Sequence, residues 1–87
     1  MSARDEDFLF VPSDRLRDFR ITEELRSALA ADPNLRAAAR RLSIHTVDGE
    51  VTLRGVVSSL AERVAIVSAA QRVAGDEHVG AWIEIRR

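Results

Sequence analysis

The stretch from Leu42 to Val57 contains the pair Asp48-Gly49 between two segments in which apolar and polar residues alternate. Alternation with a period of two is typical of β-strands, and Asp-Gly favours a two-residue turn because both turn positions need positive φ. The stretch therefore predicts an antiparallel β-hairpin with one apolar face, which other parts of the chain must cover. The predicted inward residues are Leu42, Ile44 and Thr46 on the first strand and Val51, Leu53, Gly55 and Val57 on the second.

A first covering helix is predicted at about residues 18–31. Its apolar face holds Ile21, Leu25, Ala28 and Leu29 at helical spacing. Asp32-Pro33 ends it, since a residue before proline avoids the helical region, and Glu23-Glu24 is expected in an early turn, where acids complement the helix dipole. Residues 34–41 are predicted to form a connector with room for a short helical turn.

A second helix and a third strand follow the hairpin. Ser59 and Glu62 fit a capping box, and Gly75 suits the position just past a helix end. The apolar stripe of this helix is predicted to be Ile66, Val67, Ala70, Val73 and Ala74. The inward residues of the last strand are predicted to be Val79, Ala81, Ile83 and Ile85. A glycine inside a strand is typical of a bulge or of close backbone approach, so we expect a helix to press on Gly55.

These elements predict an α+β fold, a two-layer α/β sandwich of order α-β-β-α-β. Its three-stranded sheet has both helices on one face. A chain of 87 residues makes one domain. We expect residues 1–17 to form an N-terminal arm, partly disordered or packed on the sheet or a neighbour, and residues 18–87 to form the domain. Within the arm, Phe8–Val11 before Pro12 is expected to be extended.

Composition excludes several function classes. The chain has no cysteine, so disulfides, thiolate catalysis and zinc-thiolate sites are excluded. A formal net charge of -1 gives no overall attraction to nucleic acid or anionic lipid. The acids that precede the short apolar run Phe8–Val11 do not fit a signal peptide. We therefore expect a cytoplasmic protein, or one in the periplasm or at a membrane surface if the sequence is a trimmed piece.

The ordered set of apolar and turn residues resembles the BON domain, a bacterial module named for osmotically induced and nodulation proteins. The resemblance covers about residues 18–85. It is carried by Ile21, Leu25, Ala28, Leu29, Asp32-Pro33, Leu35, Leu42, Ile44, Asp48-Gly49, Val51–Leu53, Gly55, Val57, Ala70, Val73, Gly75, Val79, Ile83 and Ile85. The chain departs from the family pattern at Asp76, where valine usually follows the glycine, and at Ala81, where asparagine is common. The resemblance implies a non-enzymatic module that binds phospholipid or membrane surfaces, or an accessory interaction domain.

The outward face of the predicted sheet is the candidate binding surface, because both helices occupy the other face. The residues proposed for a ligand or partner are His45, Arg54, Val56, Trp82 and Arg86. An uncovered tryptophan beside valine and arginine suits recognition. Two alternatives stay open: Trp82 packs under the arm, against Phe8 or Phe10, or this face or a strand edge forms a dimer.

No catalytic or cofactor site is expected. Ser58 and Ser59 are explained by capping, no G-x-S-x-G elbow is present, and the four glycines are scattered rather than gathered in a phosphate loop. Asp76–His78 are adjacent in one loop, a spacing that gives poor tetrahedral metal geometry. The cluster Arg36, Arg40 and Arg41 lacks the interleaved aromatics of a nucleic-acid platform, so nucleic acid is not an expected partner.

Two functions are therefore carried forward from the sequence. The first is a small non-enzymatic module that binds phospholipid, a membrane surface or an envelope component, without a cofactor. The alternative is a domain for protein–protein interaction or self-association in the cytosol. In that alternative the adhesive element is the arm segment formed by Phe8, Leu9, Phe10 and Val11.

Overall fold

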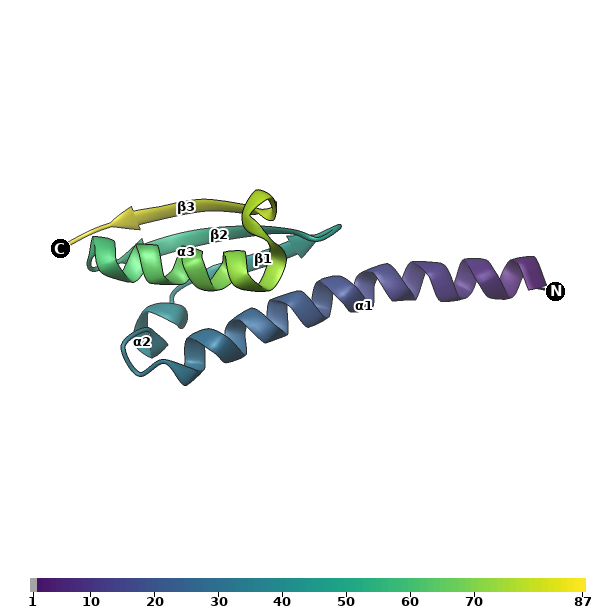
Figure 1. The fold of residues 1–87 in the computed structure, drawn as a ribbon, viewed down its shortest axis with the longest axis horizontal. Coiled ribbons are helices and arrows are strands. Elements are labelled where there is room, and N and C mark those ends of the chain that lie inside the picture. The colour runs from purple at the N-terminus through teal and green to yellow at the C-terminus, as the bar shows by residue number, and fades with distance from the viewer. Residues whose placement is uncertain (1) are drawn as a thin grey trace.

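The computed structural model describes the backbone of residues 2–87 and the side chains from residue 15 onward. Its elements are α1 (Ser2–Ala31), α2 (Arg36–Ala39), β1 (Ser43–Val47), β2 (Glu50–Val57), α3 (Leu60–Ala74), the 3₁₀ turn η1 (Asp76–His78) and β3 (Val79–Ile85) (Figure 1). The predicted α-β-β-α-β order is confirmed, with α2 as the helical turn expected in the connector. The division at residue 17 into arm and domain stays a prediction.

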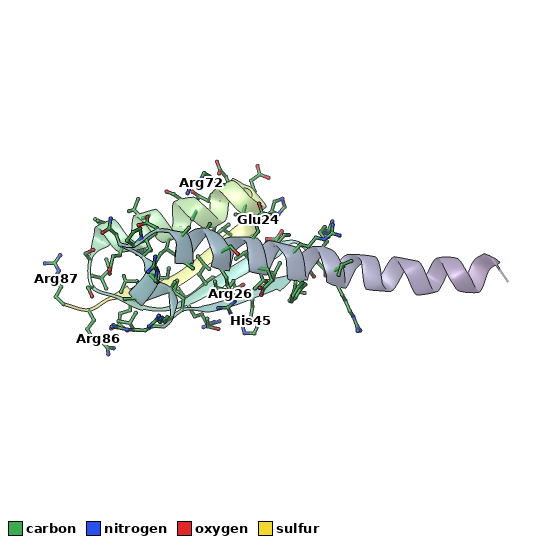
Figure 2. All side chains as sticks on the ribbon, turned by 90° about the horizontal axis from the view of Figure 1, so that it is seen from below. Glu24, Arg26, His45, Arg72, Arg86 and Arg87 are labelled. Carbon is green, nitrogen blue, oxygen red and sulfur yellow. The ribbon has the colours of Figure 1, made fainter. Side chains whose placement is uncertain are left out.

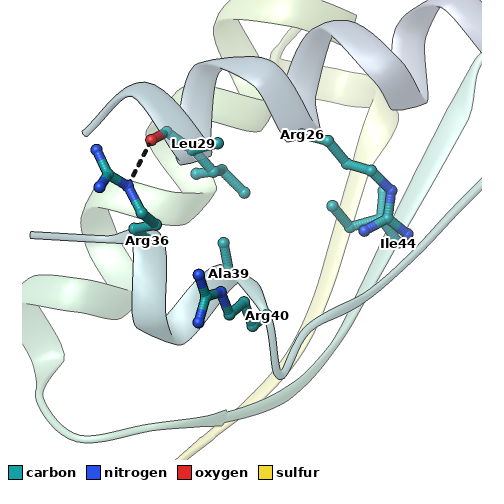
Figure 3. A pocket seen from close by; sticks show the side chains of 7 residues that line it. Arg26, Leu29, Arg36, Ala39, Arg40 and Ile44 are labelled. Carbon is teal, nitrogen blue, oxygen red and sulfur yellow. Dashed lines mark hydrogen bonds between the residues drawn. The ribbon is translucent and has the colours of Figure 1, made fainter. Parts of the chain in front are cut away.

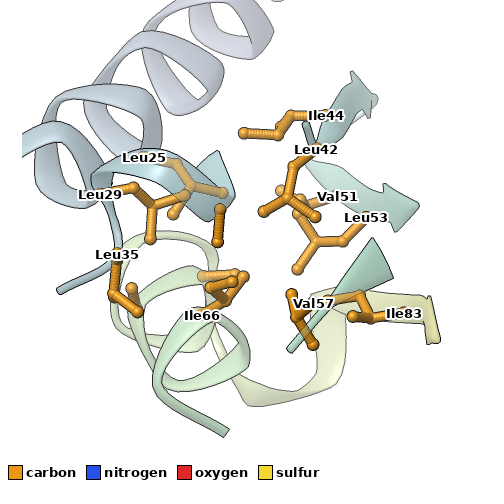
Figure 4. Packing of buried hydrophobic residues seen from close by; sticks show 13 residues of the cluster. Leu25, Leu29, Leu35, Leu42, Ile44, Val51, Leu53, Val57, Ile66 and Ile83 are labelled. Atoms are coloured by element: carbon orange, nitrogen blue, oxygen red, sulfur yellow. The ribbon is translucent and has the colours of Figure 1, made fainter. Parts of the chain in front are cut away.

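The three strands form one mixed sheet in the order β1-β2-β3. β1 pairs antiparallel with β2, with Ile44 opposite Leu53, and β2 pairs parallel with β3, with Leu53 opposite Ala81. A parallel pair needs a long connection between its strands, and α3 supplies that connection. Both long helices lie on the same side of the sheet, as predicted, and the core fills the space between the two layers (Figure 4).

The hairpin turn has the backbone geometry that its sequence predicts. Asp48 has φ 53° and Gly49 has φ 81°, so both turn residues occupy the left-handed region. The carboxylate of Asp18, on α1, accepts hydrogen bonds from both turn N–H groups, that of Asp48 at 2.8 Å and that of Gly49 at 2.8 Å. One turn further along α1, the hydroxyls of Thr22 and Thr46 lie 2.6 Å apart. The helix is thus tied to the hairpin by polar contacts as well as by the core.

The core is apolar and close to the predicted one. Its largest fully buried side chains are Leu25, Leu29, Leu53, Ile66, Val51 and Val57. Burying one such side chain contributes about 1.5–3 kcal/mol. Ala28 was predicted to face the core but is exposed. Because successive helical residues are rotated by about 100°, α1 presents Asp18, Thr22 and Leu25 to the sheet and turns Ala28 toward solvent.

Gly55 marks a close approach of two backbones, as predicted, but a different segment makes the approach. A Cβ at Gly55 would lie 2.8 Å from Leu42 Cδ2 and 3.0 Å from the carbonyl oxygen of Arg41. The connector between α2 and β1 therefore presses on β2 at this point, and the expectation of a helix is wrong. The φ of 156° at Gly55 adds a backbone reason for glycine.

α1 begins at Ser2, much earlier than the predicted start near residue 18. The extended conformation predicted for Phe8–Val11 is therefore wrong, and Glu23-Glu24 does not lie in an early turn. Proline removes one backbone hydrogen bond from a helix and is unfavourable by about 3 kcal/mol. Alanine, arginine, glutamate and leucine around Pro12 favour the helix on both sides of it. The far end of α1 extends beyond the sheet (Figure 1).

α3 begins and ends where its sequence signals predict. The hydroxyl of Ser59 accepts a hydrogen bond from the N–H of Glu62 at 3.1 Å, and the Glu62 carboxylate accepts one from the N–H of Ser58 at 2.7 Å. The carboxylate thus reaches one residue beyond the cap, a small variation on the predicted capping box. Gly75, with φ 100°, terminates the helix.

Candidate functional site

The outward face of the sheet is the side turned away from α1 and α3. The alternation of side chains places on this face Ser43, His45 and Val47 from β1, Glu50, Thr52, Arg54 and Val56 from β2, and Gly80, Trp82 and Glu84 from β3. In the part of the chain whose side chains are described, two large apolar residues of this face are exposed, Val47 by 64% and Trp82 by 61%. The face therefore combines charged groups with apolar ones.

Trp82 is the most distinctive residue of this surface. A Cβ at Gly80 would lie only 2.6 Å from Trp82 Cζ3, so the indole reaches back along β3 over a position that has no side chain. Arg54, directly opposite Trp82 in the strand register, holds its guanidinium carbon 5.6 Å from the centre of the ring. A cation–π contact at an exposed site contributes about 0.5–1 kcal/mol. Glycine and arginine together orient an exposed aromatic surface.

The remaining predicted residues are arranged around Arg54 rather than gathered on Trp82. Val56 is the next outward residue of β2, and it lies opposite Glu84. His45 is opposite Thr52, so it is a diagonal neighbour of Arg54. Arg86 lies toward the other end of the sheet from His45 (Figure 2). Its guanidinium donates to both carboxylate oxygens of Glu84 at 3.1 Å, so its charge is already partnered.

The expected role of the arm stays a prediction. The side chains of Phe8, Leu9, Phe10 and Val11 lie outside the described side chains, so neither self-association nor packing of Phe8 or Phe10 on Trp82 is tested. Among the described side chains, Trp82 is 61% exposed.

His78, at the end of η1, pairs with Glu50 at the start of β2. The side chains of His78 and Glu50 are 50% and 58% exposed, so this pair links η1 to β2 at the protein surface. Among the described residues, no three histidine or acidic side chains come together as a metal ligand set. The pairing gives His78 a structural contact that its sequence neighbours Asp76 and Glu77 did not indicate.

The arginine cluster of the connector is divided by the fold. Arg36 and Arg40 line a cavity between α1, α2 and β1, together with Arg26 of α1, whereas Arg41 lines a different hollow beside β2. Reasoning from the sequence missed this cavity, because Arg26 is far from the connector along the chain. The available signal was the spacing of Arg36 and Arg40, four residues apart, which places both on one side of a helical turn.

No helix in the described part of the chain combines the length and the apolar character needed to cross a membrane. Among curated proteins, none matches the chain. A comparison with known protein families matches residues 17–87 to the BON domain. The matched region contains the hairpin, α3 and β3, the part of α1 that covers the sheet, and all five residues of the predicted binding surface. The chain belongs to the BON domain family.

Proposed function

We propose that this BON domain is a non-enzymatic module that binds anionic phospholipid surfaces through its outward sheet face, around Trp82 and Arg54. The family is associated with phospholipid and membrane binding. The observation that carries the proposal is the exposed indole of Trp82, held between Gly80 and the guanidinium of Arg54.

The two side chains suit the interface between water and lipid for different reasons. Tryptophan prefers the headgroup level of a membrane, where its ring is partly buried and its N–H stays hydrated. Arginine near an anionic surface contributes about 1 kcal/mol, and its guanidinium forms paired hydrogen bonds with phosphate. Glu50 and Glu84 on the same face oppose this attraction. We therefore expect weak binding that decreases as salt is added.

The test is co-sedimentation of the full chain with vesicles of phosphatidylglycerol and phosphatidylcholine at low salt. Trp82→Ala removes the indole, and Phe19→Ala is its matched control because Phe19 is also 61% exposed but lies on α1. Arg54→Gln removes the cation, and Arg72→Gln, an exposed arginine on α3, removes the same charge elsewhere.

The proposal predicts that Trp82→Ala and Arg54→Gln each reduce the bound fraction by severalfold, whereas the two control variants bind like the wild type. Pure phosphatidylcholine vesicles should bind less than the mixture, because the attraction of Arg54 depends on lipid charge. The proposal is overturned if the wild type does not bind at low salt. It is also overturned if Phe19→Ala, and not Trp82→Ala, abolishes binding, since the contact surface is then α1.

A further inference from the structure

We infer that a cavity between α1, α2 and β1 binds one anionic amphiphile with a single alkyl chain and a phosphate headgroup. The cavity has a volume of about 280 Å³ and is lined by Arg26, Leu29, Ala30, Arg36, Ala39, Arg40 and Ile44. Figure 3 shows Arg26, Arg36 and Arg40 around the opening, with Leu29, Ala39 and Ile44 between them.

The lining separates into an apolar floor and a basic rim. Leu29 and Ile44 are buried core residues, and Ala30 and Ala39 add two small apolar side chains. An alkyl chain placed on this floor removes apolar surface from water, at about 25 cal/mol for each Å². The floor therefore provides an affinity for hydrocarbon that a site for a free inorganic anion would not need.

The rim provides the charge. Arg26, Arg36 and Arg40 are exposed, and no acidic side chain lines the cavity. Neither of the two ion pairs in the part of the chain with described side chains involves these arginines. The Nε of Arg36 donates to the carbonyl oxygen of Ala30 at 3.0 Å, and this contact fixes the side chain at the edge of the cavity. Three like charges around one opening repel one another, and an anion between them relieves that repulsion.

Two other hollows on the domain lack this combination. Glu62 lines both the hollow near Leu35 and the one near Val57; the first also includes Asp32, and the second also includes Arg41. An anionic headgroup would be repelled in the first hollow, and in the second the charge of Glu62 offsets that of Arg41. The charge of the lining thus distinguishes the arginine-rimmed cavity from its neighbours.

The volume of the cavity favours a ligand with one alkyl chain. Ligand pockets usually have volumes of about 300–1,000 Å³, and this cavity lies just below that range. A phosphate with one short alkyl chain is of suitable size, whereas a phospholipid with two long chains is not. The cavity adjoins β1, and Trp82 lies on β3 at the opposite edge of the sheet. The inference therefore shares lipid chemistry with the proposed function but concerns a separate surface.

The test is calorimetric titration of the full chain with octyl phosphate below its micelle concentration, beside inorganic phosphate and octyl glucoside. The first probe has both parts of the ligand, the second only the head and the third only the chain. We expect octyl phosphate to bind at least about tenfold more tightly than either partial probe, because a charge-assisted hydrogen bond and an apolar contact each change affinity by about that factor. Equal affinity for octyl phosphate and either partial probe would contradict the inference.

Variants locate the site. The double substitution Arg26→Gln and Arg40→Gln should weaken octyl phosphate binding by about tenfold or more, and both residues are exposed, so folding should be preserved. Arg72→Gln on α3 is the matched control and should bind octyl phosphate normally. Loss of binding in Trp82→Ala, with the double variant unaffected, would assign the ligand to the sheet face and overturn the inference. If the wild type binds octyl phosphate but does not bind vesicles, the proposed function is overturned and this inference stands.

Discussion

Gly55→Ala tests the close approach between β2 and the connector at Arg41 and Leu42. The new Cβ would lie 2.8 Å from Leu42 Cδ2 and 3.0 Å from the carbonyl oxygen of Arg41. The carbonyl belongs to the backbone and cannot rotate away, so β2 or the connector must move. Overpacking of this kind is unfavourable by about 1–3 kcal/mol. The φ of 156° strains any residue with a Cβ by about 1–3 kcal/mol more.

We therefore expect Gly55→Ala to lower the free energy of unfolding by about 2–6 kcal/mol. A domain of 87 residues has a total of about 4–13 kcal/mol. The corresponding fall in Tm is at least about 8 °C. Urea denaturation followed by far-ultraviolet circular dichroism measures the free energy, and a thermal scan measures Tm.

Gly80→Ala is the matched control. Its new Cβ would lie 2.6 Å from Trp82 Cζ3, an even shorter distance, but this atom is the far end of an exposed side chain that is free to move. We expect a change of less than about 1 kcal/mol, because alanine also restricts the unfolded chain. The indole should be displaced, so near-ultraviolet circular dichroism should change. The reasoning is refuted if the two variants lose equal stability, or if Gly55→Ala unfolds like the wild type.

Three further predictions concern Asp18, Ser59 and residues 1–12. Asp18→Ala should lower the free energy of unfolding in urea by about 1–3 kcal/mol, because both N–H groups of the hairpin turn lose their acceptor. Asp18→Asn should lower it less, because the amide oxygen of asparagine still accepts. Equal losses of stability in the two variants would argue against the double contact. Ser59→Ala should destabilise by about 1 kcal/mol through loss of the α3 cap, and an unchanged urea midpoint would contradict this. If residues 1–12 mediate self-association, the full chain should exceed the monomer mass in light scattering and the chain lacking them should not; two monomers would exclude that role.

The hairpin and α3 were predictable because local chemistry determines them. The turn at Asp48-Gly49 requires positive φ at both positions, and the cap at Ser59 satisfies N–H groups at the start of a helix. Neither depends on distant parts of the chain. The family resemblance drawn from the same ordered residues is confirmed over residues 17–87.

What the sequence did not predict depends on contacts between distant segments. The predicted start of α1 near residue 18 is wrong, because the helix begins at Ser2 and continues through Pro12. The double hydrogen bond from Asp18 to the hairpin joins residues about 30 positions apart, and no local pattern indicates such a partner. The exposure of Ala28 likewise follows from the rotation of α1 on the sheet, which packing decides.

The candidate surface was predicted in part. Alternation along the strands placed Trp82 and Arg54 on one face, and the register brings them into contact. The pairing of Arg86 with Glu84 was not predicted, since short exposed ion pairs depend on side-chain rotamers. The cavity around Arg26 was not predicted, because two helices and a strand meet there from separate parts of the sequence. The ligand-binding roles of these residues, and the expected cytoplasmic location, stay predictions.

Trp82 is the only tryptophan of the chain, so its fluorescence reports directly on the central proposal. The measurement is the emission spectrum of the full chain titrated with phosphatidylglycerol vesicles at low salt, with brominated lipid as a quencher. We predict a shift to shorter wavelength and quenching by the brominated lipid, because the exposed indole enters the headgroup region. Vesicle binding with an unshifted and unquenched spectrum would show that the sheet face does not contact lipid and would contradict the proposal.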